Sequence, residues 1–110
     1  MIEYELAIVG YTKNYTQMFF ESIVLAYLES NKFIYCGESK GEFSLEQVRE
    51  LCSKFKNLIT PCPTAVIVPN GRLQSIFWIR PSLVCLVEDA EEINDQNIKL
   101  YNFKKLILKN

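Results

Sequence analysis

The residues of this chain best suited to binding chemistry are basic side chains set among aromatic or turn residues. Lys13 lies between Tyr11 and Tyr15, an interleaving of aromatic and basic groups that nucleic-acid-binding surfaces favour. Arg72 follows the Asn70-Gly71 turn, where its permanently charged, planar guanidinium suits contact with a phosphate. Both patterns are also common on solvated surfaces, so the sequence leaves a purely structural role open for each of them.

Several kinds of catalysis are excluded by what the chain lacks. It contains no histidine, which removes Ser-His and Cys-His catalytic pairs and the commonest transition-metal ligand. No Cys-x-x-Cys pair occurs among the four cysteines, which are Cys36, Cys52, Cys62 and Cys85. We therefore expect reduced, structural thiols and no bound metal or other cofactor in this chain. Two internal disulfides in an exported protein are the alternative.

The size and charge of the chain restrict its class. Its 110 residues suit a single domain, residues 1–110, and 49% of them are hydrophobic, as in a folded protein. A net charge of −1 and a pI near 5.5 argue against a general polyanion binder. No secretory h-region opens the sequence, and no apolar run has the length of a membrane span. We expect a cytoplasmic protein.

The first forty residues predict a β-meander. Tyr4–Val9 is an apolar-rich run that ends at Gly10 and is typical of a strand. Phe19–Leu28 is a longer β-prone run, and Phe33–Cys36 is its partner across a polar turn at residues 29–32.

The hydrophobic period then changes from that of a strand to that of a helix. Apolar residues follow the i, i+3, i+4 spacing of one helical face, at Leu45, Val48, Leu51, Cys52 and Phe55. Ser44 and Gln47 form a capping box, in which each side chain bonds a free backbone N–H at the start of the helix. The pattern predicts a helix over residues 44–57 that ends before the prolines at 61 and 63.

The second half of the chain predicts short strands. Ala65–Val68, Phe77–Ile79 and Leu83–Val87 are β-prone, and residues 80–82 (Arg-Pro-Ser) divide the last two. Residues 88–95 hold five carboxylates and are expected to be solvated. The adjacent Glu91 and Glu92 are not expected to bind one cation together, because neighbouring side chains of a strand point to opposite faces. Five to seven strands with one inserted helix predict a mainly β fold, a small Greek-key barrel of the OB type.

Four blocks carry a family resemblance in the same order and spacing. They are Ile8-Val9-Gly10-Tyr11-Thr12, Phe20-Glu21-Ser22-Ile23-Val24-Leu25-Ala26, Tyr35-Cys36-Gly37 with the residues to Ser44, and Trp78-Ile79-Arg80-Pro81-Ser82-Leu83-Val84-Cys85-Leu86-Val87. From about residue 6 to residue 109 the chain resembles the C-terminal OB-fold domain of ATP-dependent DNA ligases, and it is most similar to the ligase module of bacterial and archaeal end-joining enzymes. The last block is its most specific part.

The resemblance implies DNA contacts, but this chain departs from the family at basic positions. The family has a lysine near nucleotide or DNA where this chain has Glu38, a reversal of charge that would repel a phosphate. Lys40 could substitute from two residues further on. The terminal basic block, which orients the ATP pyrophosphate in the family, has lost its leading arginine and retains Lys104 and Lys105 as partial matches. Trp78 could stack on a base, but its place in the block favours the core.

The resemblance also implies that the chemistry resides elsewhere. Ligases form a lysyl-adenylate on a Lys-x-Asp-Gly motif in a separate nucleotidyltransferase domain, and no such motif occurs here. ATP and Mg²⁺ are thus implied for a parent ligase rather than for this chain. We expect an OB-fold domain that grips duplex DNA at a nick, through Lys13, Lys40, Arg72, Lys104 and Lys105, while a catalytic domain or subunit transfers the nucleotide. The alternative is a stand-alone module that binds single-stranded nucleic acid or a protein partner.

Overall fold

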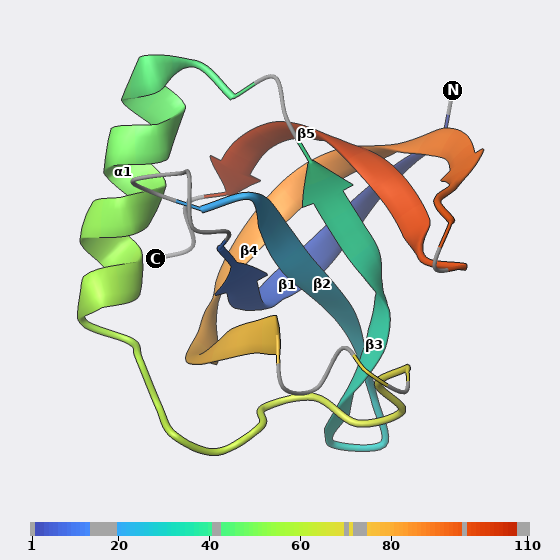
Figure 1. Ribbon diagram of the computed structural model, residues 1–110, viewed down its shortest axis with the longest axis horizontal. Helices are drawn as coiled ribbons and strands as arrows, with labels where there is room; N and C mark the ends of the chain where they lie inside the picture. The colour runs from blue at the N-terminus through green and yellow to red at the C-terminus, as the bar shows by residue number, and fades with distance from the viewer. Residues whose placement is uncertain are drawn as a thin grey trace.

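Five strands close into a barrel, and one helix lies beside it (Figure 1). A computed structural model describes residues 2–13, 20–40, 43–69, 71, 75–95 and 97–107. The elements are β1 (Glu3–Thr12), β2 (Ser22–Glu29), β3 (Lys32–Lys40), α1 (Leu45–Lys56), β4 (Ile76–Ile93) and β5 (Lys99–Ile107). The strand order is β1-β2-β3-β5-β4, with β4 returning to β1. The expected small OB-like barrel is confirmed.

The β2–β3 hairpin turns where the sequence predicts. Ser30 and Asn31 both have positive φ, at 50° and 66°, as a two-residue type I′ turn requires. Asparagine tolerates this conformation because its short polar side chain adapts to it better than most.

Helix α1 has the predicted cap. The Ser44 hydroxyl accepts a hydrogen bond from the Gln47 backbone N–H at 3.1 Å, and the Gln47 side chain accepts one from the Ser44 N–H at 3.0 Å. The helix ends at Asn57, its C-cap. Leu51 and Phe55 are its buried residues, and Val48 and Cys52 pack against the same cluster, so this part of the stripe faces the barrel as expected; Leu45 is exposed. This helix is too short and too polar to span a bilayer, and the described ranges contain no candidate membrane span.

The prediction of two short strands after residue 76 was wrong, because β4 is one continuous strand through Ile93. Where β4 pairs with β1, Leu83 lies opposite Ile8 and Trp78 lies opposite Gly10. The four residues 79–82 of β4 are therefore opposite Val9 alone. Pro81 falls in this bulge, where a missing N–H breaks no ladder bond. The strand also includes most of the acidic stretch, and Glu88 is buried rather than solvated.

The barrel closes between β3 and β5, where Glu38 pairs with Leu100 and Ser39 pairs with Tyr101 in parallel. Gly37 makes this closure possible. Its φ is +152°, and a Cβ at this position would collide with the backbone carbonyl oxygen of Lys99.

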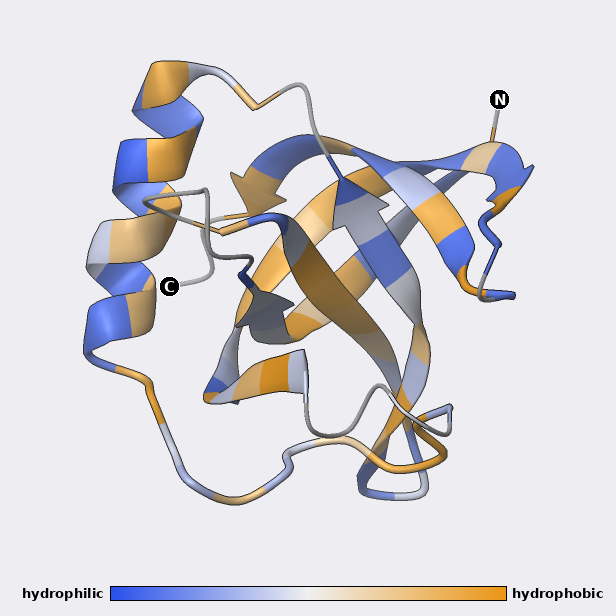
Figure 2. Cartoon of the chain, viewed as in Figure 1, coloured by the Kyte–Doolittle hydropathy of each residue, from blue (hydrophilic) through white to orange (hydrophobic). Residues whose placement is uncertain are grey.

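Both faces of β2 are buried from Ser22 to Ala26, which is why this part of the strand is almost uniformly hydrophobic (Figure 2). Ile23 and Leu25 belong to the cluster inside the barrel, which also contains Leu51 and Phe55 of α1. Their neighbours Val24 and Ala26 point to the other face and pack in a second cluster with Ala65, Ile76 and Trp78. The segment before β4 therefore covers the outside of the sheet, where Val66 makes an isolated bridge to Ile34 of β3 in place of the expected strand.

Candidate nucleic-acid interface

Lys13 lies at the end of β1, beside a column of aromatic rings. Tyr11 stacks on Phe55 at a centroid distance of 5.1 Å and on Phe77 at 5.4 Å, with interplanar angles of 2° and 14°. The Lys13 ammonium is 5.8 Å from the centroids of both Tyr11 and Phe77. This distance is within the range of a cation–π contact, so the aromatic rings help to position the charge.

Lys40 reaches the same end of the barrel through the strand register. Thr12 pairs with Ser22, and Ser22 pairs with Lys40 on the next strand, so the last residues of β1 and β3 lie at one edge. Two strand spacings separate them, about 10 Å. Lys40 is exposed, as is Lys13.

Helix α1 adds two cations that the sequence analysis did not single out. Lys56 lines a pocket together with Lys13, and Arg49 precedes Lys56 by seven residues, two turns along the same side of the helix. The helical period identifies Arg49 and Lys56 as neighbours of the apolar stripe, and the docking of α1 brings Lys56 beside Lys13 of the barrel. We call Lys13, Lys40, Arg49 and Lys56 the cationic edge.

The structure places Lys104 and Lys105 on another side of α1, along β5. The Lys104 ammonium forms an ion pair with Glu88, and the hydrogen bond to that carboxylate raises the pKa of Lys104. Lys105 lines a shallow pocket between β5 and α1 that also includes Glu50. Each lysine thus has a carboxylate close by. Nearby on the same strand pair, Lys99 bonds Asp89 at 2.7 Å, which lowers the pKa of the Asp89 carboxyl.

Glu38 does not lie where a phosphate could approach it. Its side chain is fully buried, and its carboxyl oxygens accept hydrogen bonds from the Ser22 hydroxyl and the Tyr35 hydroxyl, each at 2.9 Å. Thr12 extends the network, with its hydroxyl 2.6 Å from that of Ser22. The expected repulsion of a phosphate by Glu38 is therefore wrong, because this residue is a buried polar group with hydrogen-bond partners.

The remaining candidate residues lie in the core, on the surface, or outside the residues that the structure describes. Trp78 is buried in the outer cluster, as its place in the sequence block favours. Arg72 and Tyr15 lie outside the described residues. Glu91 and Glu92 are exposed, and Glu91 lies in a bulge with φ of 55°. All four thiols are free, with Cys85 buried, Cys62 exposed and the other two half-buried.

Comparison with known families decides what this barrel is. The sequence profile of the family described as ATP dependent DNA ligase C terminal region matches residues 16–106, most of the chain. The chain belongs to this family. Comparison with curated protein sequences gives no match.

Solved structures of ligases share the fold of this ligase C-terminal domain. The ligase domain of M. tuberculosis LigD matches with a TM-score of 0.80 and 16% identity, over 96% of this chain and 35% of that one. A mycobacterial DNA ligase D, in complex with ATP and MES, matches with a TM-score of 0.77 and 16% identity, over 99% of this chain and 35% of that one. The chain thus spans about a third of the length of these relatives.

Proposed function

We propose that this ligase C-terminal domain binds the phosphate backbone of nicked duplex DNA through its cationic edge. The observation that carries the proposal is that Lys13 and Lys56 line one pocket at the end of β1, with Lys40 at the same end of the sheet and Arg49 two helical turns before Lys56. Within the described ranges, no ion pair engages any of these four. They are therefore better placed for phosphate contacts than Lys104, which Glu88 already neutralises.

The same proposal defines what the domain does for a ligase. A separate nucleotidyltransferase domain or subunit, carrying the lysine nucleophile and using ATP and Mg²⁺, performs the chemistry, and the barrel holds the duplex at the nick. Backbone contacts of this kind fix position and carry little sequence information. Since the net charge is −1, the affinity should be that of non-specific binding, with Kd of about 10⁻⁴ to 10⁻⁶ M. A role in cytoplasmic DNA repair by end joining follows from the resemblance and belongs to the same proposal.

Salt dependence of binding to nicked duplex tests this assignment. The variant K13Q/K40Q/K56Q should bind more weakly than the parent, and the slope of log K against log salt should fall by about 0.9 for each phosphate that the variant no longer neutralises. The variant K104Q/K105Q should change the slope by at most about 0.9, the value for a single phosphate. K32Q/K54Q controls for the loss of two charges away from the edge, because Lys32 lies at the hairpin turn and Lys54 follows Glu50 of the β5 pocket by one helical turn.

Two results would contradict the proposal in different ways. If K104Q/K105Q lowers the slope more than the edge variant does, the DNA lies along β5. If the parent binds no duplex even at low salt, the domain is a module for single-stranded nucleic acid or for a protein partner.

A further inference from the structure

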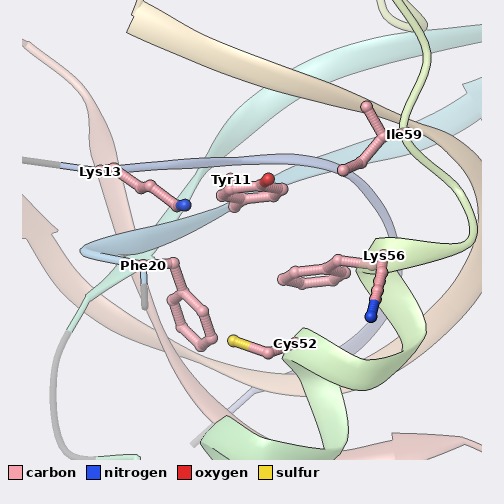
Figure 3. A pocket seen from close by; sticks show the side chains of 7 residues that line it. Tyr11, Lys13, Phe20, Cys52, Lys56 and Ile59 are labelled. Carbon is pink, nitrogen blue, oxygen red and sulfur yellow. The ribbon is translucent and has the colours of Figure 1, made fainter. Parts of the chain in front are cut away.

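A pocket of about 200 Å³ opens between the end of β1 and the C-terminal half of α1 (Figure 3). The strand side contributes Tyr11, Lys13 and Phe20, and the helix contributes Cys52, Phe55 and Lys56, with Ile59 just beyond it. The volume is below the roughly 300–1,000 Å³ of pockets that hold drug-sized ligands. It therefore suits one planar ring system rather than a larger molecule.

The walls of the pocket are aromatic and rigidly held. Tyr11 is fixed between Phe55 and Phe77 in the ring column, and Phe20 meets Phe55 edge to face at 5.8 Å. Phe20 is held in turn by Phe43, at 5.1 Å. Because these rings are already packed, a planar ligand would find its contact surface formed before it binds.

Cations stand at both sides of this aromatic group. Figure 3 shows the Lys13 nitrogen beside the Tyr11 ring and the Lys56 side chain on the α1 side of the pocket. The seven lining residues include no carboxylate. A ligand that satisfies both features is planar and apolar in one part and anionic in the other, as a nucleotide is.

We propose that this pocket takes one unpaired nucleotide of a DNA strand, with its base against Phe20 and the edges of the stacked Tyr11 and Phe55 rings, and with its flanking phosphates at Lys13 on one side and Lys56 on the other. Stacking of bases on aromatic side chains is tolerant of sequence, so any base would enter. The inference rests on the proposed function for the identity of the polymer, since DNA on the cationic edge runs past the mouth of the pocket. It adds a preference for a nick with a displaced nucleotide.

Fluorescence of 2-aminopurine tests the proposal, because stacking quenches it. The probe is a nicked duplex with this base as a one-nucleotide flap, compared with the same nick without a flap. The parent should quench the probe and bind the flap form about tenfold more tightly. C52L fills the pocket without changing charge, so it should lose both the quenching and the tenfold preference while its affinity for the unflapped nick stays unchanged. C62L is the matched control, because Cys62 is exposed outside the pocket.

The outcomes separate this site from the proposed function. If the parent binds the unflapped nick but does not quench the flap probe, the proposed nucleotide pocket is wrong and the proposed duplex interface is still supported. Quenching that persists in folded C52L also overturns the pocket. Quenching of a short single strand by the parent, absent in C52L and without duplex binding, supports the pocket and overturns the duplex interface. If K56Q abolishes the flap preference but C62L does not, the phosphate position is supported as well.

Discussion

At the scale of single residues, the role of Glu38 depends on which face of β3 it occupies. The side chain points to the outer face, where Ala65, Ile76 and Trp78 pack, together with Val24, its partner on β2. There it accepts hydrogen bonds from Ser22 and Tyr35 instead of meeting solvent. Glu38 is therefore part of a buried polar network, and the DNA contacts that we propose involve other residues.

Removing one donor from this network should reduce stability. Tyr35→Phe keeps the ring but takes away the hydroxyl that bonds the Glu38 carboxyl. A buried acceptor left with one bond fewer costs about 1–3 kcal/mol. Urea denaturation should show this loss, whereas Tyr27→Phe at the exposed hairpin end should be neutral. Equal stability of the two variants would mean that the network contributes nothing to folding.

The buried thiols predict a loss of stability at alkaline pH. Burial raises the pKa of Cys36 to about 11 and that of Cys85 to about 12, from an ordinary value of 9.0. Above pH 9 the folded chain thus holds more thiol protons than the unfolded chain, so the free energy of unfolding falls as pH rises, by up to about 1.4 kcal/mol per pH unit for each thiol. Denaturation curves between pH 9 and 11 measure this slope. In Cys85→Val it should be shallower by the contribution of one thiol, and parallel slopes would contradict the assignment.

At the scale of elements, local signals in the sequence were sufficient where one segment determines its own structure. The capping box at Ser44 and the apolar stripe predicted α1, and the polar turn at Ser30 and Asn31 predicted the β2–β3 hairpin. These local signals were insufficient where the structure of a segment depends on pairing with a strand that is distant in the sequence. Pro81 indicated a break, but β1 accommodates it in a bulge, and the acidic end of β4 is a strand because β5 pairs with it. No local pattern contains that information.

Closure of the barrel should depend on Gly37. Gly37→Ala forces a Cβ against the Lys99 carbonyl oxygen and adds strain at a positive φ, so it should cost at least about 3 kcal/mol and loosen the β3–β5 pairing. Gly71→Ala is the matched control, because its φ is +85° but its Cβ would meet open space, and it should cost about 1–2 kcal/mol. Denaturant midpoints compare the two. Similar losses would show that backbone strain, not the close approach of β5, makes Gly37 necessary.

At the scale of the whole molecule, a barrel with a net charge of −1 has Lys13 and Lys56 in one pocket and Lys40 at the same end of the sheet. Lys104, Lys99 and their carboxylates neutralise each other along β4 and β5. The cationic edge has no such partners in the described parts of the chain. The sequence predicted Lys13 and Lys40 individually, but Arg49 and Lys56 join them only through the packing of α1, which no linear motif records.

The chain alone should not react with ATP. It has no Lys-x-Asp-Gly motif, so it lacks the lysine on which ligases form an adenylate. Incubation with radiolabelled ATP and Mg²⁺ should leave the purified protein unlabelled, with an intact ligase as the positive control. A stable labelled band would show that one of the other lysines accepts the nucleotide.

The central claim is that the cationic edge is the DNA-binding surface, and a chemical-shift map tests it most directly. Backbone amide shifts of the labelled 12.8 kDa protein are recorded at low salt while a nicked duplex is titrated in. We predict that the perturbed amides cluster at Lys13, Lys40, Arg49 and Lys56, and that added salt reverses the shifts. Perturbations confined to β5 around Lys104 and Lys105, or to the β2–β3 hairpin turn, would contradict the account.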